Sequence, residues 1–302
     1  MEFYGMIKRN VAPTPPQVRD KGQNMNYVHL TEEDRELLIN LHSFIYLHRD
    51  FIREHIYSHL GSMNTFYRRL RQMEDAGYIK AFNAPASSSD RKPSKIFTLT
   101  KFGVDMVYEL KGITHWNNRW TRQLAPFYQH QLLIAEVVKA FENKAEEAGL
   151  EFKEWVTEAR AFYEYTDKGE KKVRKLRPDG IIVIGKKGSE QCLGLMIEME
   201  RSYSTREKNL RKMEQYNEFF VRKNELLTKY DRKVGFEYPV QHFKVLFIGA
   251  DESKTKKTLR DLRGEEKGAE ISVMVTSFDE VLEAPYGSIY RYLSDPENKK
   301  KM

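Results

Sequence analysis

The residues best suited to chemistry are three carboxylates close together in the second half of the chain. Asp179 lies in an Arg-Pro-Asp-Gly segment that leads into four apolar residues, and a second apolar run ends at Glu198 and Glu200. Apolar runs of this length, bounded by glycine and charge, indicate paired buried strands. Because Glu198 and Glu200 are two positions apart, they point to the same face of a strand.

The turn between the two strands brings Asp179 within reach of Glu198, so that like charges gather in one place. The usual relief for such a cluster is a divalent cation, here Mg²⁺ or Mn²⁺. Ions of this kind activate water and stabilise the oxygens of a phosphodiester during cleavage. The structural alternative is that Asp179 is a turn residue before Gly180 and that Glu198 pairs with a basic neighbour. We favour a metal-dependent site that acts on phosphates.

Lys212 and Glu158 are candidates to complete this site. Lys212 and Tyr216 are one turn apart on a helix expected over 205–230, so both can face the carboxylates. Lys212 would orient the attacking water or polarise the scissile phosphate. Glu158, just upstream of the two strands, would add another carboxylate.

The composition favours a nucleic-acid partner. The chain has 302 residues and a formal net charge of +7, and a basic balance is typical of proteins that bind polyanions. The chain has one cysteine, Cys192, so no disulfide can form within it, which fits a reducing cytoplasm. The apolar runs are much shorter than the roughly 20 residues of a membrane helix, so no membrane association is expected.

The first half of the chain predicts a winged helix-turn-helix. After an arm at 1–29 that is expected to be flexible, Thr31 is the expected N-cap of a first helix and acidic residues fill its first turn. Helices at 49–60 and 63–76 follow, and then two short strands around a polar loop. Three helices and a β-hairpin predict a winged domain over 30–110.

The third helix and the wing carry residues suited to DNA. A recognition helix needs donors for base edges and cations for phosphates, and a wing needs groups for backbone contacts. The expected DNA-binding residues are Asn64, Thr65, Tyr67, Arg68, Arg69 and Arg71 on the helix and Arg91, Lys92 and Lys95 on the wing. The alternatives are a solvated basic helix or a surface for protein contacts, with Arg69 paired to Glu54 or Glu74.

The rest of the chain predicts a layered α/β domain over 124–302, after a linker at 111–123. The expected elements are a helix over 124–148, a strand over 152–165, the two carboxylate-bearing strands, the helix over 205–230, a strand over 242–250, a helix over 253–263, a strand over 271–276 and a last helical segment. This order of helices and strands predicts a mixed sheet covered by helices.

Pro178-Asp179 followed by Glu198-Met199-Glu200 resembles the motifs of the PD-(D/E)xK nuclease superfamily, with Glu200 where the superfamily usually has lysine. The larger set of motifs resembles the plasmid replication-relaxation proteins. It consists of Trp155 to Glu158, Arg177 to Gly180, Glu198 to Arg201, and Lys212 to Tyr216. The resemblance spans about 30–282, and that family is similar in layout to mobilisation relaxases with a PD-(D/E)xK-like domain.

The resemblance implies an α+β protein with an N-terminal winged helix-turn-helix followed by an α/β PD-(D/E)xK nuclease-like domain with a mixed central sheet. It implies a DNA-binding protein that acts on plasmid DNA in replication or relaxation, and this supports action on the DNA better than its cleavage. The sharper hypothesis, from the carboxylates, is nicking of DNA with Mg²⁺ or Mn²⁺. Asp179 and Glu198 would hold the metal with help from Glu158, and Glu200 and Lys212 would complete the catalytic set.

The expected partners are double-stranded plasmid DNA and replication or relaxosome proteins, and the sequence leaves a homodimer open. The alternative function is a nuclease-dead plasmid replication or transcription factor. Such a protein would use the same fold only for contacts with DNA and proteins.

Overall fold

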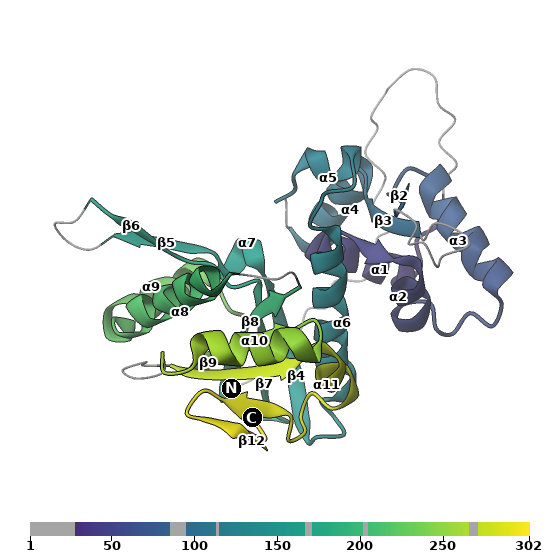
Figure 1. Ribbon diagram of the computed structural model, residues 1–302. Helices are drawn as coiled ribbons and strands as arrows, with labels where there is room; N and C mark the ends of the chain where they lie inside the picture. Colours follow the sequence, from purple (N-terminus) through teal and green to yellow (C-terminus); the bar gives the residue numbers. More distant parts are fainter. Residues whose placement is uncertain (1–27, 85–94, 113–114, 167–170, 202–204, 266–270) are drawn as a thin grey trace, which may run out of the picture.

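Helices and a small sheet come first in the chain (Figure 1). The computed structural model describes residues 28–84, 95–112, 115–166, 171–201, 205–265 and 271–302. The first elements are α1 (Glu32–Phe44), β1 (Leu47–His48), α2 (Arg49–His55), α3 (Met63–Asp75), β2 (Ile79–Asn83), β3 (Lys95–Leu99), α4 (Lys101–Lys111) and α5 (Asn118–Arg122). The strands pair in the order β1-β3-β2. Helices α1 to α3 and the β2–β3 hairpin follow the order expected of a winged helix-turn-helix. Arg91 and Lys92 lie outside the described residues.

Local signals explain where the first helices begin and end. Thr31 caps α1, and its side chain and that of Asp34 bond each other's backbone amides as a capping box. Helix α2 ends at His55, five residues before the expected end at Leu60. The chain turns there because the Tyr57 side chain enters the core, and Arg53 donates to the carbonyls of Tyr57 and Leu60.

A mixed sheet forms the centre of the second half. The elements are α6 (Tyr128–Lys144), β4 (Leu150–Thr157), α7 (Glu158–Ala161), β5 (Tyr163–Thr166), β6 (Val173–Leu176), β7 (Gly180–Lys186), β8 (Cys192–Glu200), α8 (Arg206–Phe220), α9 (Lys223–Val234), β9 (Val240–Gly249), α10 (Glu252–Leu262), β10 (Ser272–Ser277), α11 (Phe278–Glu283), β11 (Tyr290–Tyr292) and β12 (Asp295–Lys300). Seven of the described strands pair in the order β12-β11-β10-β9-β8-β7-β4. β8, β9 and β10 are parallel to one another, and the other neighbours are antiparallel. The expected α+β class with a mixed central sheet is confirmed.

Alternation along the strands decides which helices each side chain meets. Ile182 and Ile197 belong to the cluster that contains the apolar residues of α6 and α11. Ile181 and Met196 belong to the cluster on the other face, with residues of α8, α9 and α10. Because side chains on a strand alternate between faces, Glu198 and Glu200 share the α8 face with Met196.

Three elements differ from the sequence-based expectation. The strand expected over 152–165 is two strands, β4 and β5, with the short helix α7 between them. The helix expected over 205–230 is α8 and α9, which are separated at Val221 and Arg222, where the Arg222 amide bonds the Phe219 carbonyl three residues earlier. The end of the chain forms the β11–β12 hairpin, where Lys299 and Lys300 pair with Glu280 and Asp295.

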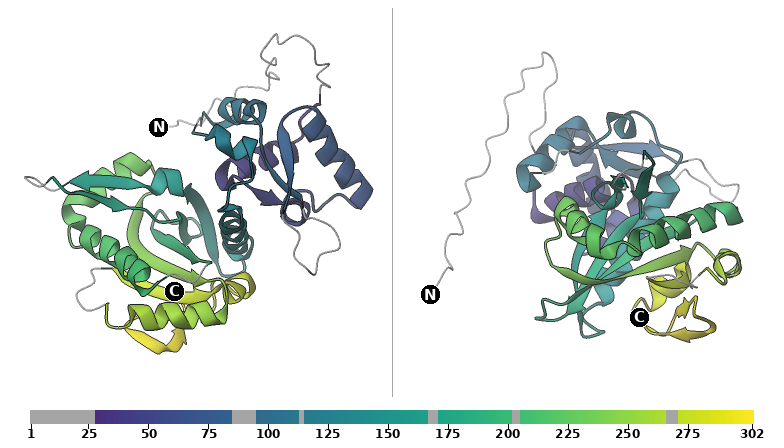
Figure 2. Two further views of the ribbon diagram at one scale, coloured as in Figure 1. Left: turned by 45° about the horizontal axis from the view of Figure 1, so that its top comes forward. Right: turned by 90° about the vertical axis from the view of Figure 1, so that its left-hand side faces the viewer.

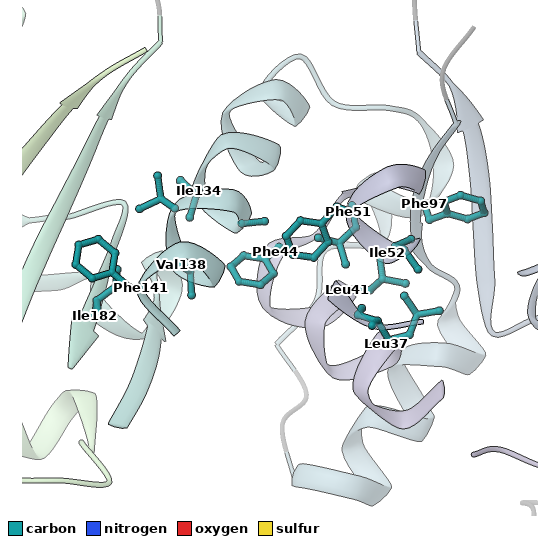
Figure 3. Close-up of a cluster of buried hydrophobic side chains, with 14 of the residues drawn as sticks. Leu37, Leu41, Phe44, Phe51, Ile52, Phe97, Ile134, Val138, Phe141 and Ile182 are labelled. Carbon is teal, nitrogen blue, oxygen red and sulfur yellow. The ribbon is translucent and has the colours of Figure 1, made fainter. Parts of the chain in front are cut away.

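Helix α6 joins the two halves through one continuous core. Ile134, Val138 and Phe141 of α6 lie in the same buried cluster as Phe44 of α1 and Ile182 of β7. Figure 3 shows α6 between the N-terminal part (described residues 28–84 and 95–112) and the sheet, with apolar side chains directed to both. The N-terminal part is therefore packed against the sheet, since α6 shares one core with both of them. None of the helices in the described ranges has the length and apolar character needed to cross a bilayer.

A buried ion pair fixes α3 against α1. Asp34 is fully buried and accepts hydrogen bonds from Tyr57 Oη at 2.6 Å and from Arg69 Nε at 2.9 Å. Burial disfavours the charged form of Asp34, but the bonds from Arg69 and Tyr57 hold its pKa below its ordinary value. Arg69 thus has a structural ion pair, as in the alternative to DNA contact, but its partner is Asp34 and not Glu54 or Glu74.

We expect Arg69→Ala to destabilise the fold and Arg68→Ala to leave it unchanged. Loss of Arg69 leaves the buried Asp34 carboxylate without its cation, and breaking a buried pair in this way costs about 3–5 kcal/mol. Arg68 is exposed on the same helix, so it is the matched control. Urea denaturation gives the free energy of unfolding of both variants, and equal values would contradict this role of the Asp34–Arg69 pair.

Candidate active site at the ends of strands β7 and β8

The candidate site lies where β7 begins and β8 ends. Gly180, the first residue of β7, pairs with Ile197 of β8, and the Asp179 amide donates to the Ile197 carbonyl at 2.9 Å. A Cβ atom on Gly180 would lie 2.0 Å from Cη2 of Trp155, so only glycine fits at this position. The close packing holds Asp179 beside the end of β8, next to Glu198.

Both oxygens of Asp179 have partners. The Met199 amide donates to Oδ2 at 2.7 Å, and His130 Nε2 lies 3.2 Å from Oδ1. Burial disfavours the charge of Asp179, but the contact with His130, the charge of Lys212 and the Met199 amide together outweigh burial and lower the pKa of Asp179. Burial would also lower the pKa of His130, yet the hydrogen bond to Asp179 raises it above its ordinary value. The two groups therefore favour an ion pair at the first turn of α6.

His130 was missing from the sequence-based site. It lies in a helix far upstream of Asp179 in the sequence, and no local spacing links the two residues. Their contact arises only when α6 packs on the sheet, which is a property of the tertiary fold.

Glu198 is the most deeply buried charge of the site. Its side chain is 1% exposed, and its Oε1 accepts a hydrogen bond from Tyr216 Oη at 2.6 Å. Its Oε2 lies 2.5 Å from Lys212 Nζ in an ion pair that is not an aligned hydrogen bond. Burial raises the pKa of Glu198 to about 7, and nearby Asp179 adds to this effect, while Lys212 and Tyr216 oppose it. One lysine does not fully compensate this carboxylate.

Lys212 lies between the two glutamates. Its Nζ is 2.7 Å from Glu200 Oε1, and Glu200 is 3% exposed. Burial would lower the pKa of Lys212, but Glu198, Asp179 and Glu200 together raise it far above its ordinary value. The ammonium group therefore stays charged and is shared by both glutamates.

Helix α8 places Lys212 and Tyr216 over the end of β8. Thr205 caps α8 by accepting a hydrogen bond from the Lys208 amide. Met213 and Phe219 of α8 are buried in the core between α8 and the sheet, so the helix face next to them is directed at the strand ends. The four-residue spacing of Lys212 and Tyr216 then puts both on Glu198, as the sequence had suggested.

Glu158 lies at the same end of the sheet, but it is paired with Arg177 and not with Lys212. It begins α7, and its Oε1 accepts a hydrogen bond from Arg177 Nε at 2.6 Å. Within the described residues, no three His, Cys, Asp or Glu side chains are grouped so that they could hold a metal ion. Of the site residues expected from the sequence, the structure brings together Asp179, Glu198, Glu200 and Lys212. Glu158 lies nearby, in its ion pair with Arg177.

The residues expected to contact DNA divide into an exposed set and a set with other contacts. Asn64, Tyr67, Arg68, Arg71 and Lys95 are exposed, and Thr65 is half-buried. Arg69 is held by Asp34. The guanidinium of Arg49, which was not in the expected set, lies 5.8 Å from the centre of the Tyr67 ring. Tyr67, Arg71, Lys95 and Arg49 line one hollow between α3 and the β2–β3 hairpin.

The sequence profile of the replication-relaxation family matches residues 41–229. No curated protein is significantly similar to the chain. Among solved structures, restriction endonuclease FokI aligns with 14% identity and a TM-score of 0.30. FokI bound to DNA aligns with 17% identity and a TM-score of 0.28. Each alignment covers 83% of this chain and 43% of the FokI chain, so this chain spans less than half of FokI. Similarity this low supports no conclusion about activity.

We expect the metal-free protein to lose stability as the pH rises from 5 to 8. Glu198 keeps its proton in the folded state up to about pH 7, whereas in the unfolded chain it loses it near pH 4.5. The folded state therefore binds more protons in this range, and raising the pH favours unfolding. The raised pKa of His130 acts in the same direction.

Unfolding free energies of wild type, Glu198→Gln and Glu214→Gln at several pH values test this expectation. Glu198→Gln should flatten the decrease. Glu214, exposed on the same helix, should leave it unchanged when replaced. A slope that is the same in wild type and Glu198→Gln would show that Glu198 is already ionised at low pH.

Proposed function

The chain belongs to the replication-relaxation family, and we propose that it acts on plasmid DNA in replication or relaxation as a Mg²⁺- or Mn²⁺-dependent nicking endonuclease. The family supports a role connected with DNA. The single observation that carries the nicking proposal is the position of Lys212 Nζ, 2.5 Å from Glu198 and 2.7 Å from Glu200. It lies at the strand ends that also hold Asp179. A cation and carboxylates at one point are what metal-assisted phosphodiester cleavage requires.

The carboxylates of Asp179 and Glu198 fit a magnesium ion by their chemistry. Mg²⁺ prefers oxygen donors and is often held by one or two carboxylates, with water and phosphate oxygens as its other ligands. Burial and the nearby Asp179 carboxylate raise the pKa of Glu198 to about 7. A bound cation would oppose both effects, because it favours the charged form of Glu198. Glu158 would join these ligands only after its ion pair with Arg177 opens.

A metal ion bound there would polarise the scissile phosphate and activate a water molecule. The chain's own groups fix the geometry around it. His130 and the Met199 amide orient Asp179, and Tyr216 orients Glu198. Lys212 would stabilise the negative charge on the phosphate or hold the attacking water. Fixed polar groups of this kind need little rearrangement during the reaction.

The lysine of the superfamily motif has a substitute in this proposal. Glu200 occupies the sequence position where that lysine usually stands, and Lys212 of α8 reaches the same place from the helix above. Glu200 would then serve to anchor the ammonium group. The role of the motif is kept although its order in the sequence changes.

DNA would be recognised by the N-terminal part, which we interpret as a winged helix-turn-helix domain. We place the contact on the exposed face of α3, with Asn64, Thr65, Tyr67, Arg68 and Arg71, and on Lys95 of β3, with Arg91 and Lys92 of the wing in addition. Arg69 would act indirectly, because Asp34 holds its guanidinium and thereby fixes the angle of α3.

One observation favours the nuclease-dead alternative. Asp179 is paired with His130, and both glutamates are paired with Lys212, so the site is a closed network of side chains. Such a network can stabilise the ends of β7 and β8 without a metal. A protein of this kind would bind plasmid DNA through α3 and use the second half for structure or protein contacts.

We expect Lys212→Ala to slow the nicking of supercoiled plasmid in Mg²⁺ by on the order of a hundredfold, the size of effect seen when one charge-stabilising group is removed. Lys208→Ala is the matched control, because Lys208 is exposed one turn earlier on α8. Adding Glu200→Lys to Lys212→Ala should restore part of the rate. Such a recovery would also show that the loss in Lys212→Ala is not caused by misfolding.

Equal nicking rates in Lys212→Ala and wild type would remove Lys212 from the mechanism. A folded wild-type protein that binds plasmid DNA but does not nick it in Mg²⁺ or Mn²⁺ would leave the DNA-binding alternative as the function.

A further inference from the structure

The β5–β6 ribbon stands out from the central sheet and has two different faces. It projects beyond α8 and α9 in Figure 1 and in the left view of Figure 2. On the inner face, Tyr165 and Leu176 are buried, and the Tyr165 ring lies 5.8 Å from that of Phe219 in α8. Arg174 lies on the same face, with its Nε 3.4 Å from Glu218 of α8. The inner face is therefore used by the fold.

The outer face of the ribbon carries exposed cations. Val173, Lys175 and Arg177 alternate with the buried residues, and their exposed fractions are 51%, 53% and 65%. Lys175 pairs with Glu164 at 2.9 Å, and Arg177 pairs with Glu158 at 2.6 Å. The side chains of these two pairs are between 33% and 65% exposed. Exposed ion pairs are weak and are screened by salt. A phosphate group can replace either carboxylate as the partner of the cation.

The row of outer-face residues leads directly to the candidate active site. Arg177 is two positions before Asp179, and only Pro178 separates it from that carboxylate. Residues two apart on an extended strand recur about every 7 Å on one side. Lys175 and Arg177 thus form a basic track whose last residue is two positions from Asp179.

We propose that the outer face of the β5–β6 ribbon binds the phosphate backbone of double-stranded DNA and guides it to the Asp179 site. The inference rests on the proposed function, and it adds a second DNA contact that is separate from α3. Charge complementarity selects this partner, because the face offers two exposed cations and little exposed apolar surface. Val173 is the one large apolar side chain that is exposed among the described ribbon residues, and Phe162, next to Lys175, is half-buried. DNA binding would shift Arg177 from Glu158 to a phosphate.

The test compares two variants with the same change in charge. Lys175→Gln/Arg177→Gln removes the track. Lys187→Gln/Lys300→Gln removes two other exposed, ion-paired cations, which lie at the far end of β7 and on the outermost strand β12. Fluorescence anisotropy with a labelled DNA duplex at several salt concentrations gives the affinity and its salt dependence.

The track variant should bind more weakly, and the slope of log K against log salt should fall by about 2, one unit for each lost phosphate contact. The control variant should match wild type. Glu164→Gln should bind DNA more tightly than wild type, because it frees Lys175. This gain is not expected if the ribbon has only a structural role.

The outcomes separate the two proposals. If wild type and control bind DNA with the same affinity and slope as the track variant, the ribbon inference is overturned and the proposed function stands. If wild type does not bind DNA at low salt, both are overturned. Thermal melts of every variant accompany the titrations, and unchanged melting temperatures are expected because the replaced side chains are exposed.

Discussion

The burial of two like-charged side chains at the end of one strand is the constraint on which the rest of the structure depends. Glu198 and Glu200 point to the same face of β8 and are almost completely buried. Carboxylates in such a place are costly unless cations and hydrogen bonds compensate them. The chain supplies Lys212 and Tyr216 from α8, and it places His130 on the neighbouring Asp179. Even so, burial keeps the pKa of Glu198 raised to about 7, so these groups compensate its charged form only in part.

The same helices that balance these charges also hold the two halves together. Helix α6 carries His130 at its start, and its apolar residues pack against both α1 and β7 (Figure 3). The N-terminal part therefore has a fixed position relative to the Asp179 site. The β5–β6 ribbon leads into β7 at the same point. A DNA duplex held by α3 and by the ribbon would meet the site in a defined orientation, which is what positioning for cleavage requires.

Short-range patterns in the sequence predicted much of this arrangement. The two-residue spacing of Glu198 and Glu200 and the four-residue spacing of Lys212 and Tyr216 depend only on strand and helix geometry, so the contacts among them could be anticipated. The motifs also indicated the replication-relaxation family. Contacts between distant segments could not be anticipated: His130 reaches Asp179, and Arg69 reaches Asp34, only through tertiary packing. The break between α8 and α9 was missed because no glycine or proline marks it in the sequence around Val221 and Arg222.

The most direct measurement is the melting temperature of the metal-free protein with and without millimolar Mg²⁺ at pH 6 and at pH 8. If the buried carboxylates are built to receive a divalent cation, Mg²⁺ raises the melting temperature. It does so more at pH 8, where Glu198 has lost its proton. Asp179→Asn should remove the effect. A melting temperature that neither Mg²⁺ nor Mn²⁺ changes at either pH value would contradict a metal site at the ends of β7 and β8.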